Sequence, residues 1–159
     1  MLETRNNIDK AWIEAHIPHQ GTMCLLDKVT SWNEEEITCH ASSHHLPNNP
    51  LRYQDQLSTA CGIEYAAQAM AVHGALLATS LNAHNGPPRA GFLVSVRGAT
   101  VHRARLDDIK HPLEIKATCS HRAGDNILYK FSLHAANELL LEGRAAVMLN
   151  ADKVLESAK

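Results

Sequence analysis

Alternating hydrophobic and polar residues predict that antiparallel β-strands make up the second half of the chain. Three segments alternate in this way: residues 113–120, 127–134 and 139–149. A period of two places successive side chains on opposite faces of a sheet, so that one face is packed and the other meets water. The short turns at residues 122–126 and 135–138 join these strands into a meander. Apolar runs predict three further strands, at residues 24–29, 37–43 and 91–103.

The segment from Leu57 to Leu81 predicts one long helix. It is rich in Ala, Leu and Met, contains no proline, and is long enough for about six turns. Ser58 or Thr59 is the expected N-cap, and a second, short helix is expected at residues 8–15. A helix that is apolar nearly all round is buried on most sides. We therefore expect a single α+β domain over residues 1–159, with an antiparallel sheet wrapped around one central helix.

Composition and charge narrow the possible functions. The 159 residues are enough for one domain, and 45% hydrophobic residues supply a core. With 15 Lys and Arg against 17 Asp and Glu, the chain has no basic field that would attract nucleic acid. No apolar run reaches the roughly 20 residues that span a bilayer, and the first residues are charged where a signal peptide is apolar. We expect a cytoplasmic protein with neither a nucleic-acid nor a membrane partner.

The cysteines and histidines do not predict a metal site. The four cysteines form no C-x-x-C pair, and no Cys/His spacing repeats among the eleven histidines. Zinc needs clustered ligands, usually four of them. Cysteines in a cytosolic chain are expected to be buried small hydrophobic residues. We therefore expect no bound metal.

Glu64 stands out as a carboxylate in apolar surroundings. It is the only formally charged residue between Asp55 and Arg89, and it lies near the start of the predicted helix. Burying an unpaired carboxylate is costly, so Glu64 must be paired or be protonated with a raised pKa. Buried carboxyls with raised pKa values are suited to act as general acids. The alternative is a structural carboxylate that caps a neighbouring loop or faces a subunit rim.

Two adjacent histidines, His44 and His45, lie in the loop that leads to this helix. A neutral imidazole can accept a proton near neutral pH, and a Glu acid with a His base can carry out a β-elimination. The base removes the proton next to a carbonyl, and the acid protonates the leaving hydroxyl. The other interpretation is an exposed loop pair without a chemical role.

Three further residues near Glu64 are candidates for binding substrate. Gln68 lies one turn after Glu64, on the same helix face, and could orient the carboxyl group. The amides around Thr59 and Ala60, at the helix start, could polarise a carbonyl group. Gln68 could equally satisfy nearby backbone groups.

Three segments resemble the bacterial 3-hydroxyacyl-acyl-carrier-protein dehydratases. IPHQGTMCLLDKV (17–29) resembles the N-terminal signature of that family, and GIEYAAQAMA (62–71) resembles its central-helix motif. GFLVSVRGATVHRARLDD (91–108) is similar to the next strand and the acidic turn after it. The likeness is greatest to the dehydratase branch linked to aryl-polyene-type pigments and related lipids. It implies a hotdog fold, a dehydratase activity without a cofactor, and substrates bound to acyl carrier protein.

The resemblance also implies roles for individual residues. The family forms its active site across a dimer interface, where a loop histidine meets the helix glutamate of the other subunit. Carried over to this chain, Glu64 is the acid and His44 the base, because Ser43-His44 followed by Asn49-Pro50 fits the closer branch. His45 is the alternate, since His45-Leu46-Pro47 imitates the His-Phe-Pro of the housekeeping enzymes. His19 matches a family position that is structural or lines the pocket, and it is not expected to be the base.

The chain departs from the housekeeping enzymes in the link between histidine and helix. Here the link, LPNNPLRYQDQLSTAC, is longer and lacks the Pro-Gly that sets the helix start. Because the Pro-Gly is missing, the helix start need not present the same oxyanion donors as in those enzymes. The longer link implies an entrance of a different shape, and therefore a different acyl group.

Three functions remain in play. The first is dehydration of 3-hydroxyacyl thioesters on acyl carrier protein to trans-2-enoyl thioesters. The second is a non-catalytic hotdog subunit of a dehydratase heterodimer, and the third is a hotdog acyl thioesterase. An unpaired sheet edge implies a homodimer or a hetero-oligomer with another hotdog protein. Carrier docking needs a basic patch, and the candidates are scattered, at Arg89, Arg97, Arg103 and Arg105.

Overall fold

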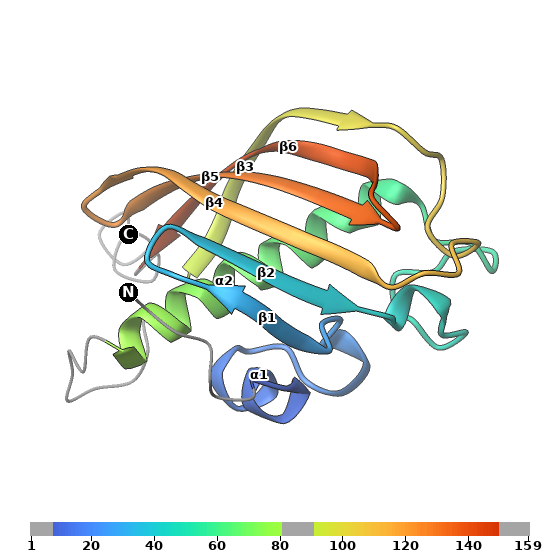
Figure 1. Cartoon of the computed structure of the whole chain (residues 1–159), viewed down its shortest axis with the longest axis horizontal. Coiled ribbons are helices and arrows are strands. Elements are labelled where there is room, and N and C mark those ends of the chain that lie inside the picture. The colour runs from blue at the N-terminus through green and yellow to red at the C-terminus, as the bar shows by residue number, and fades with distance from the viewer. Residues whose placement is uncertain (1–7, 81–90, 150–159) are drawn as a thin grey trace, which may run out of the picture.

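One curved antiparallel sheet wraps around a long helix in the computed structural model (Figure 1). The structure describes residues 8–80 and 91–149. The helices are α1 (Lys10–His16) and α2 (Gly62–Ser80). The strands are β1 (Lys28–Trp32), β2 (Glu36–Ala41), β3 (Gly91–Val101), β4 (Leu113–Ala123), β5 (Asn126–Ala135) and β6 (Glu138–Leu149). Their order across the sheet is β1-β2-β4-β5-β6-β3, which confirms the predicted α+β architecture.

Two tight hairpins build the predicted meander of β4, β5 and β6. Gly124 and Asp125 join β4 to β5, with a positive φ of 61° at Gly124. Ala136 and Asn137 join β5 to β6, with φ values of 49° and 67°. Two-residue loops need this left-handed backbone, because its twist matches that of the flanking strands.

The first predicted strand is partly wrong. β1 begins only at Lys28, whereas Cys24, Leu25 and Leu26 are buried without belonging to a strand. The Leu25 amide donates to the side-chain oxygen of Gln68, Oε1, at 2.9 Å, and not to a neighbouring strand. Burial made this segment strand-like in sequence, but the Leu25 amide bonds to α2 and the Leu25 carbonyl accepts a hydrogen bond from Ser43 Oγ. The second strand likewise ends at Ala41, and Ser43–His45 form a short 3-10 turn.

The central helix begins later than predicted. Ser58 caps a 3-10 turn, Thr59–Cys61, by accepting a hydrogen bond from the Ala60 amide at 3.2 Å. Ser58, just before this turn, is not helical, because it forms an isolated β-bridge with Arg105 in the connection between β3 and β4. The predicted end, at Leu81, lies outside the described residues. None of the described helices is long and apolar enough to cross a membrane.

The side chains on the inner face of the sheet form the core with α2. Fully buried residues from the strands include Ile115, Leu133 and Leu141. The alternation in β6 holds from Leu141 onward, but Leu140 is buried in place of the expected Leu139. The register shift between Leu133 and His134 explains this difference, since a bulge reverses which side chains face inward.

The start of α2 lies unusually close to the sheet at Gly62. A Cβ atom at this position would lie 2.7 Å from Leu133 Cδ2 and 2.8 Å from Leu141 Cδ2. Glycine therefore allows α2 to pack directly on β5 and β6. This contact fixes the distance between the sheet and the helix turn that contains Glu64.

We predict that Gly62→Ala destabilises the fold, although alanine favours helices, because its methyl group overlaps two buried leucines. The free energy of unfolding should fall by about 1–3 kcal/mol. Gly74→Ala is the matched control in the same helix, since a Cβ there has no neighbour within 4 Å. It should leave stability unchanged or raise it by up to about 1 kcal/mol. Urea unfolding of both variants tests this, and a shift in the same direction would contradict the close approach at Gly62.

Candidate active site

Glu64 lies on the first turn of α2 and lines a cavity of about 470 Å³. Its side chain is 35% exposed, so Glu64 is only partly buried. The sheet covers most of α2, but this side of the helix faces the cavity. The rest of the cavity wall is mainly apolar and includes Ala67, Ala71, Gly74, Ile127 and Val147. Glu64 is therefore a carboxylate at the edge of an apolar cavity.

Glu64 pairs with a histidine, but it is His19. His19 Nε2 lies 3.2 Å from Glu64 Oε1, and His19 also lines the cavity. The hydrogen bond from His19 lowers the pKa of Glu64, which outweighs the opposing effect of burial, and Gln68 lowers it further. Of the two states that the sequence allowed, paired or protonated, the structure shows the paired one. Glu64 is ionised at neutral pH.

The geometry of this pair fixes the tautomer of His19. A carboxylate only accepts hydrogen bonds, so His19 Nε2 carries the proton that faces Glu64. His19 Nδ1 is buried and has no partner among the described residues. In the neutral ring, Nδ1 then has a free lone pair. The arrangement can take up one proton at Nδ1 while the carboxylate stabilises the resulting charge.

Gln68 fixes the position of the carboxylate. Its Nε2 donates to the Met23 carbonyl at 2.8 Å and to Glu64 Oε1 at 3.3 Å. Its Oε1 accepts from the Leu25 amide at 2.9 Å. These partners define the orientation of the amide group, and Gln68 is completely buried. Gln68 contacts Glu64 one helix turn away, as expected from the spacing, and ties both to the segment that precedes β1.

His44, the expected base, lies inside the protein. It is 0% exposed, and its Nε2 lies 3.1 Å from the carbonyl oxygens of both Ile109 and His111. Burial, and after it the neighbouring His45, lowers the pKa of His44 to about 4. The imidazole is therefore neutral, with Nε2 donating, and its Nδ1 has no partner among the described residues. No hydrogen bond or ion pair within the described residues joins His44 to Glu64.

His45, the alternate base, is exposed and also faces the β3–β4 connection. Its Nε2 contacts the Ile109 carbonyl, and its ring lies 3.9 Å from that of His44. Arg52 holds the backbone of both histidines, with bonds of 3.2 Å and 3.1 Å to their carbonyl oxygens. Within one chain, the two histidines therefore form a group separate from the His19–Glu64 pair.

The amides of Thr59 and Ala60 are already occupied in this chain. The Thr59 amide donates to the Ala104 carbonyl at 3.2 Å, and the Ala60 amide donates to Ser58 Oγ. Neither residue lines the cavity around Glu64. The expected oxyanion donors are thus not free, because the longer link pairs with the chain after β3.

The structure shows a second pair at the cavity, between a histidine and a tyrosine, which was not predicted from the sequence. Tyr129 lines the cavity, and its hydroxyl lies 2.7 Å from Nδ1 of the buried His73. His73 Nε2 donates to the Asn33 carbonyl at 2.8 Å, so Tyr129 donates to Nδ1. Burial lowers the pKa of His73 and raises that of Tyr129. This part of the cavity wall therefore stays uncharged. Within the described ranges, no three His, Cys, Asp or Glu residues are placed to hold a metal.

We predict that the buried His44 makes the fold sensitive to acid. Its pKa is lowered to about 4 in the folded protein, below the usual 6.5, so only the unfolded chain binds a proton between these values. Stability is therefore fully present above pH 6.5 and falls as the pH approaches 4, by up to about 3 kcal/mol. Urea unfolding across this range should show a weaker dependence for His44→Gln than for the native protein. The exposed His121→Gln should keep the native dependence, and an unchanged slope in His44→Gln would contradict the prediction.

Comparison with known proteins places the chain in a family. The model of the ApeP-like family, described as ApeP dehydratase, matches residues 11–157. No curated protein sequence matches the chain. The structure is similar to that of the dehydratase heterocomplex ApeI:P from Xenorhabdus doucetiae, at 16% identity and a TM-score of 0.80, covering 92% of this chain and 97% of that one.

Thioesterases share the fold more distantly. A mutant thioesterase from Pseudomonas aeruginosa matches with 14% identity and a TM-score of 0.58, covering 91% of this chain and 96% of that one. A thioesterase from Haemophilus influenzae matches with 12% identity and a TM-score of 0.55, covering 77% and 76%. At these identities the structural matches show the hotdog fold alone, and the family model adds the kind of enzyme. Because that model spans nearly the whole chain, the protein belongs to the ApeP-like dehydratase family.

Proposed function

We propose that the protein removes water from 3-hydroxyacyl thioesters held on an acyl carrier protein and produces trans-2-enoyl thioesters. The observation that supports this best is the His19–Glu64 pair at the edge of an apolar cavity. Elimination needs one group that takes a proton and one that gives a proton, close together and next to a site for the acyl chain. A hydrogen-bonded imidazole and carboxylate meet that need.

The cavity suits an acyl chain. Its wall along α2 consists of small residues, including Ala67, Ala71 and Gly74, and the opposite wall contributes Ile127 and Val147. The thioester carbonyl makes the C2 proton acidic, so the reaction itself requires no electron-accepting cofactor. An acyl chain that enters the cavity displaces water and strengthens the electrostatic interactions between the substrate and the pair.

The tautomer of His19 suggests how the proton moves. His19 Nδ1 takes the proton from C2, which requires the residues that bury this atom to move aside, and the proton on Nε2 passes to Glu64 across the 3.2 Å contact. Glu64 then protonates the C3 hydroxyl, the C3–O bond breaks, and water leaves as the C2–C3 double bond forms. The carboxylate thus becomes the acid only after C2 has lost its proton, which is consistent with a lowered pKa for Glu64 in the free protein.

His44 is the second candidate base, with His45 as its alternate. His44 Nδ1 has a free lone pair, because Nε2 faces two carbonyl groups. To act on a substrate beside Glu64, His44 would have to approach from a second subunit, as the family resemblance implies. It is fully buried within its own chain, so this role also requires movement of the surrounding loop.

We predict that Glu64→Gln and His19→Gln each lower dehydration by about 10²–10⁴-fold, because each removes one proton-transfer group. Formation of the enoyl thioester from a 3-hydroxyacyl carrier substrate measures this, with the protein alone and together with a partner hotdog subunit. Glu114→Gln is the matched control, since Glu114 also pairs with a histidine, His40, at 3.6 Å but lies outside the cavity. It should keep native activity.

The outcomes separate the candidates. A large loss in His44→Gln with native activity in His19→Gln would overturn the His19 role but keep the reaction. Native activity in Glu64→Gln would favour a non-catalytic subunit, and release of a free thiol would identify a thioesterase.

The edge of β3 is the proposed contact with a second hotdog subunit. At the other edge of the sheet, the N-terminal segment covers part of β1, because Asp9 bridges to Lys28 and the Val29 amide donates to the Ile8 carbonyl. β3 has no such cover among the described residues, and its Val94 is 58% exposed. An open apolar edge tends to pair with another strand. The heterocomplex found for the similar ApeI:P protein is consistent with a hetero-oligomer.

We predict that Val94→Lys weakens this assembly, because it places a charge on the pairing edge. Light scattering of the protein, alone and mixed with a partner subunit, should show a lower mass than for the native chain. Thr30→Lys, on β1 at the opposite edge, should leave the mass unchanged. Equal effects of the two variants would argue against assembly through β3.

A further inference from the structure

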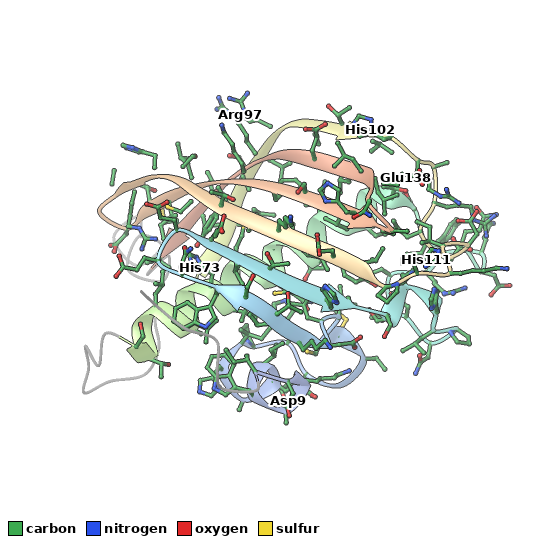
Figure 2. All side chains as sticks on the ribbon, in the orientation of Figure 1. Asp9, His73, Arg97, His102, His111 and Glu138 are labelled. Atoms are coloured by element: carbon green, nitrogen blue, oxygen red, sulfur yellow. The ribbon has the colours of Figure 1, made fainter. Side chains whose placement is uncertain are left out.

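Three cations line up on the outer face of the sheet, the face turned away from α2. Lys130 of β5 lies directly opposite Arg144 of β6, and Arg144 lies directly opposite Arg97 of β3. All three side chains are exposed, and Figure 2 shows Arg97 projecting away from α2. We call these three residues the basic row. They are distant in sequence, and only the strand register brings them into line.

The basic row lacks internal counter-charges. None of its three side chains forms a hydrogen bond or ion pair with any other described residue. The other candidate arginines behave differently, because Arg103 pairs with Asp108 and Glu138, and Arg105 pairs with Asp107. Arg89 lies outside the described residues. Of the candidate arginines within residues 8–80 and 91–149, Arg97 is the one that joins this cationic group.

This alignment of cations lowers the stability of the folded state. Like charges directly opposite each other destabilise a sheet. The chain as a whole has a formal charge of −2, so the row is a local feature rather than part of a general positive charge. One carboxylate, Glu142, lines a hollow beside the row, but it pairs with His102 at 2.9 Å and forms no ion pair with the row. A partner with further negative charges would relieve the repulsion.

The surroundings of the row suit carboxylates. Lys130 and Arg144 line two adjoining hollows of about 460 Å³ and 650 Å³. Hydroxyl groups surround the cations in these hollows: Ser95, Ser120, Thr100, Thr118 and Ser132. Gly98 leaves room beside Arg144, because a Cβ at this position would lie 3.7 Å from Arg144 Nη2. Hydroxyl and cationic donors together are the groups that bind carboxylates.

The spacing of the row indicates the shape of the partner. Neighbouring strands lie about 4.8 Å apart, so the row repeats across the sheet at that interval. Acidic side chains on one face of an α-helix repeat every turn, about 5.4 Å. A helix laid across β3, β6 and β5 would therefore set one carboxylate near each cation. We propose that the basic row docks an acidic α-helix of a partner protein.

This surface is separate from the His19–Glu64 site. Tyr129 and Ala145 flank the row in sequence but point to the inner face, where both are buried. The basic row lies on the opposite face, so the proposal stands or falls independently of dehydration by the Glu64 site.

Binding of a designed peptide tests the proposal. The probe is a labelled helical peptide with glutamates at i, i+4, i+7 and i+11 on one face, measured by fluorescence anisotropy with the full chain. Replacing Arg97, Lys130 and Arg144 together by Gln should weaken binding about tenfold or more. Replacing Lys28, Lys110 and Arg122 together by Gln makes the same change in net charge elsewhere on the surface and should leave binding nearly native. High salt should weaken native binding.

Three results would overturn the proposal. One is equal loss in both triple variants, which would indicate a general charge effect. Another is equal binding of a peptide of the same composition with its glutamates spread around the helix. The third is displacement by millimolar inorganic phosphate, or tighter binding of duplex DNA, which would identify a simple anion or polyanion site. The basic-row variant should also unfold at the same or a higher urea concentration than the native protein, since it removes repulsion, and a lower midpoint would contradict the unpaired arrangement.

Discussion

The contact between α2 and the inner face of the sheet determines where every part of the candidate site lies. Gly62 lets the first turn of the helix rest on Leu133 and Leu141, where a side chain would overlap them. Glu64 follows two residues later and is held at the edge of the cavity rather than beneath the strands. Because protein interiors are close-packed, a small change in this contact would move the carboxylate relative to its partners.

The polar groups around Glu64 form a connected set that the apolar cavity makes effective. Gln68 orients the carboxylate and at the same time bonds the segment before β1, while His19 reaches Glu64 from the loop after α1. Two pieces of chain that are not strands are thus bound to one helix turn. If an acyl chain fills the cavity, as proposed, few waters remain to compete, and these hydrogen bonds then act on the substrate with little screening.

The two faces of the sheet serve different purposes. The period of two sends apolar residues inward to α2 and the cavity, and charged residues outward. On the outer face, pairing of β3, β6 and β5 aligns Arg97, Arg144 and Lys130 without counter-charges. One pattern of alternation therefore gives the molecule a candidate site on one face and a charged surface on the other.

The local sequence pattern alone determined the meander of β4 to β6, the existence of the central helix, and the contact between Glu64 and Gln68. Side chains alternate between the two faces of a strand, and residues four apart lie side by side on a helix, so these features follow from sequence spacing. It did not reveal that His19 would be the histidine beside Glu64, nor that His44 would be enclosed with its Nε2 on two carbonyl groups. It also misplaced the start of β1, since a buried segment bonded to Gln68 has the same composition as a strand. Contacts between residues far apart in sequence depend on how α2 packs and how the strands register. Only the tertiary structure decides them, because many partners of equal chemistry compete for each polar group until packing selects one.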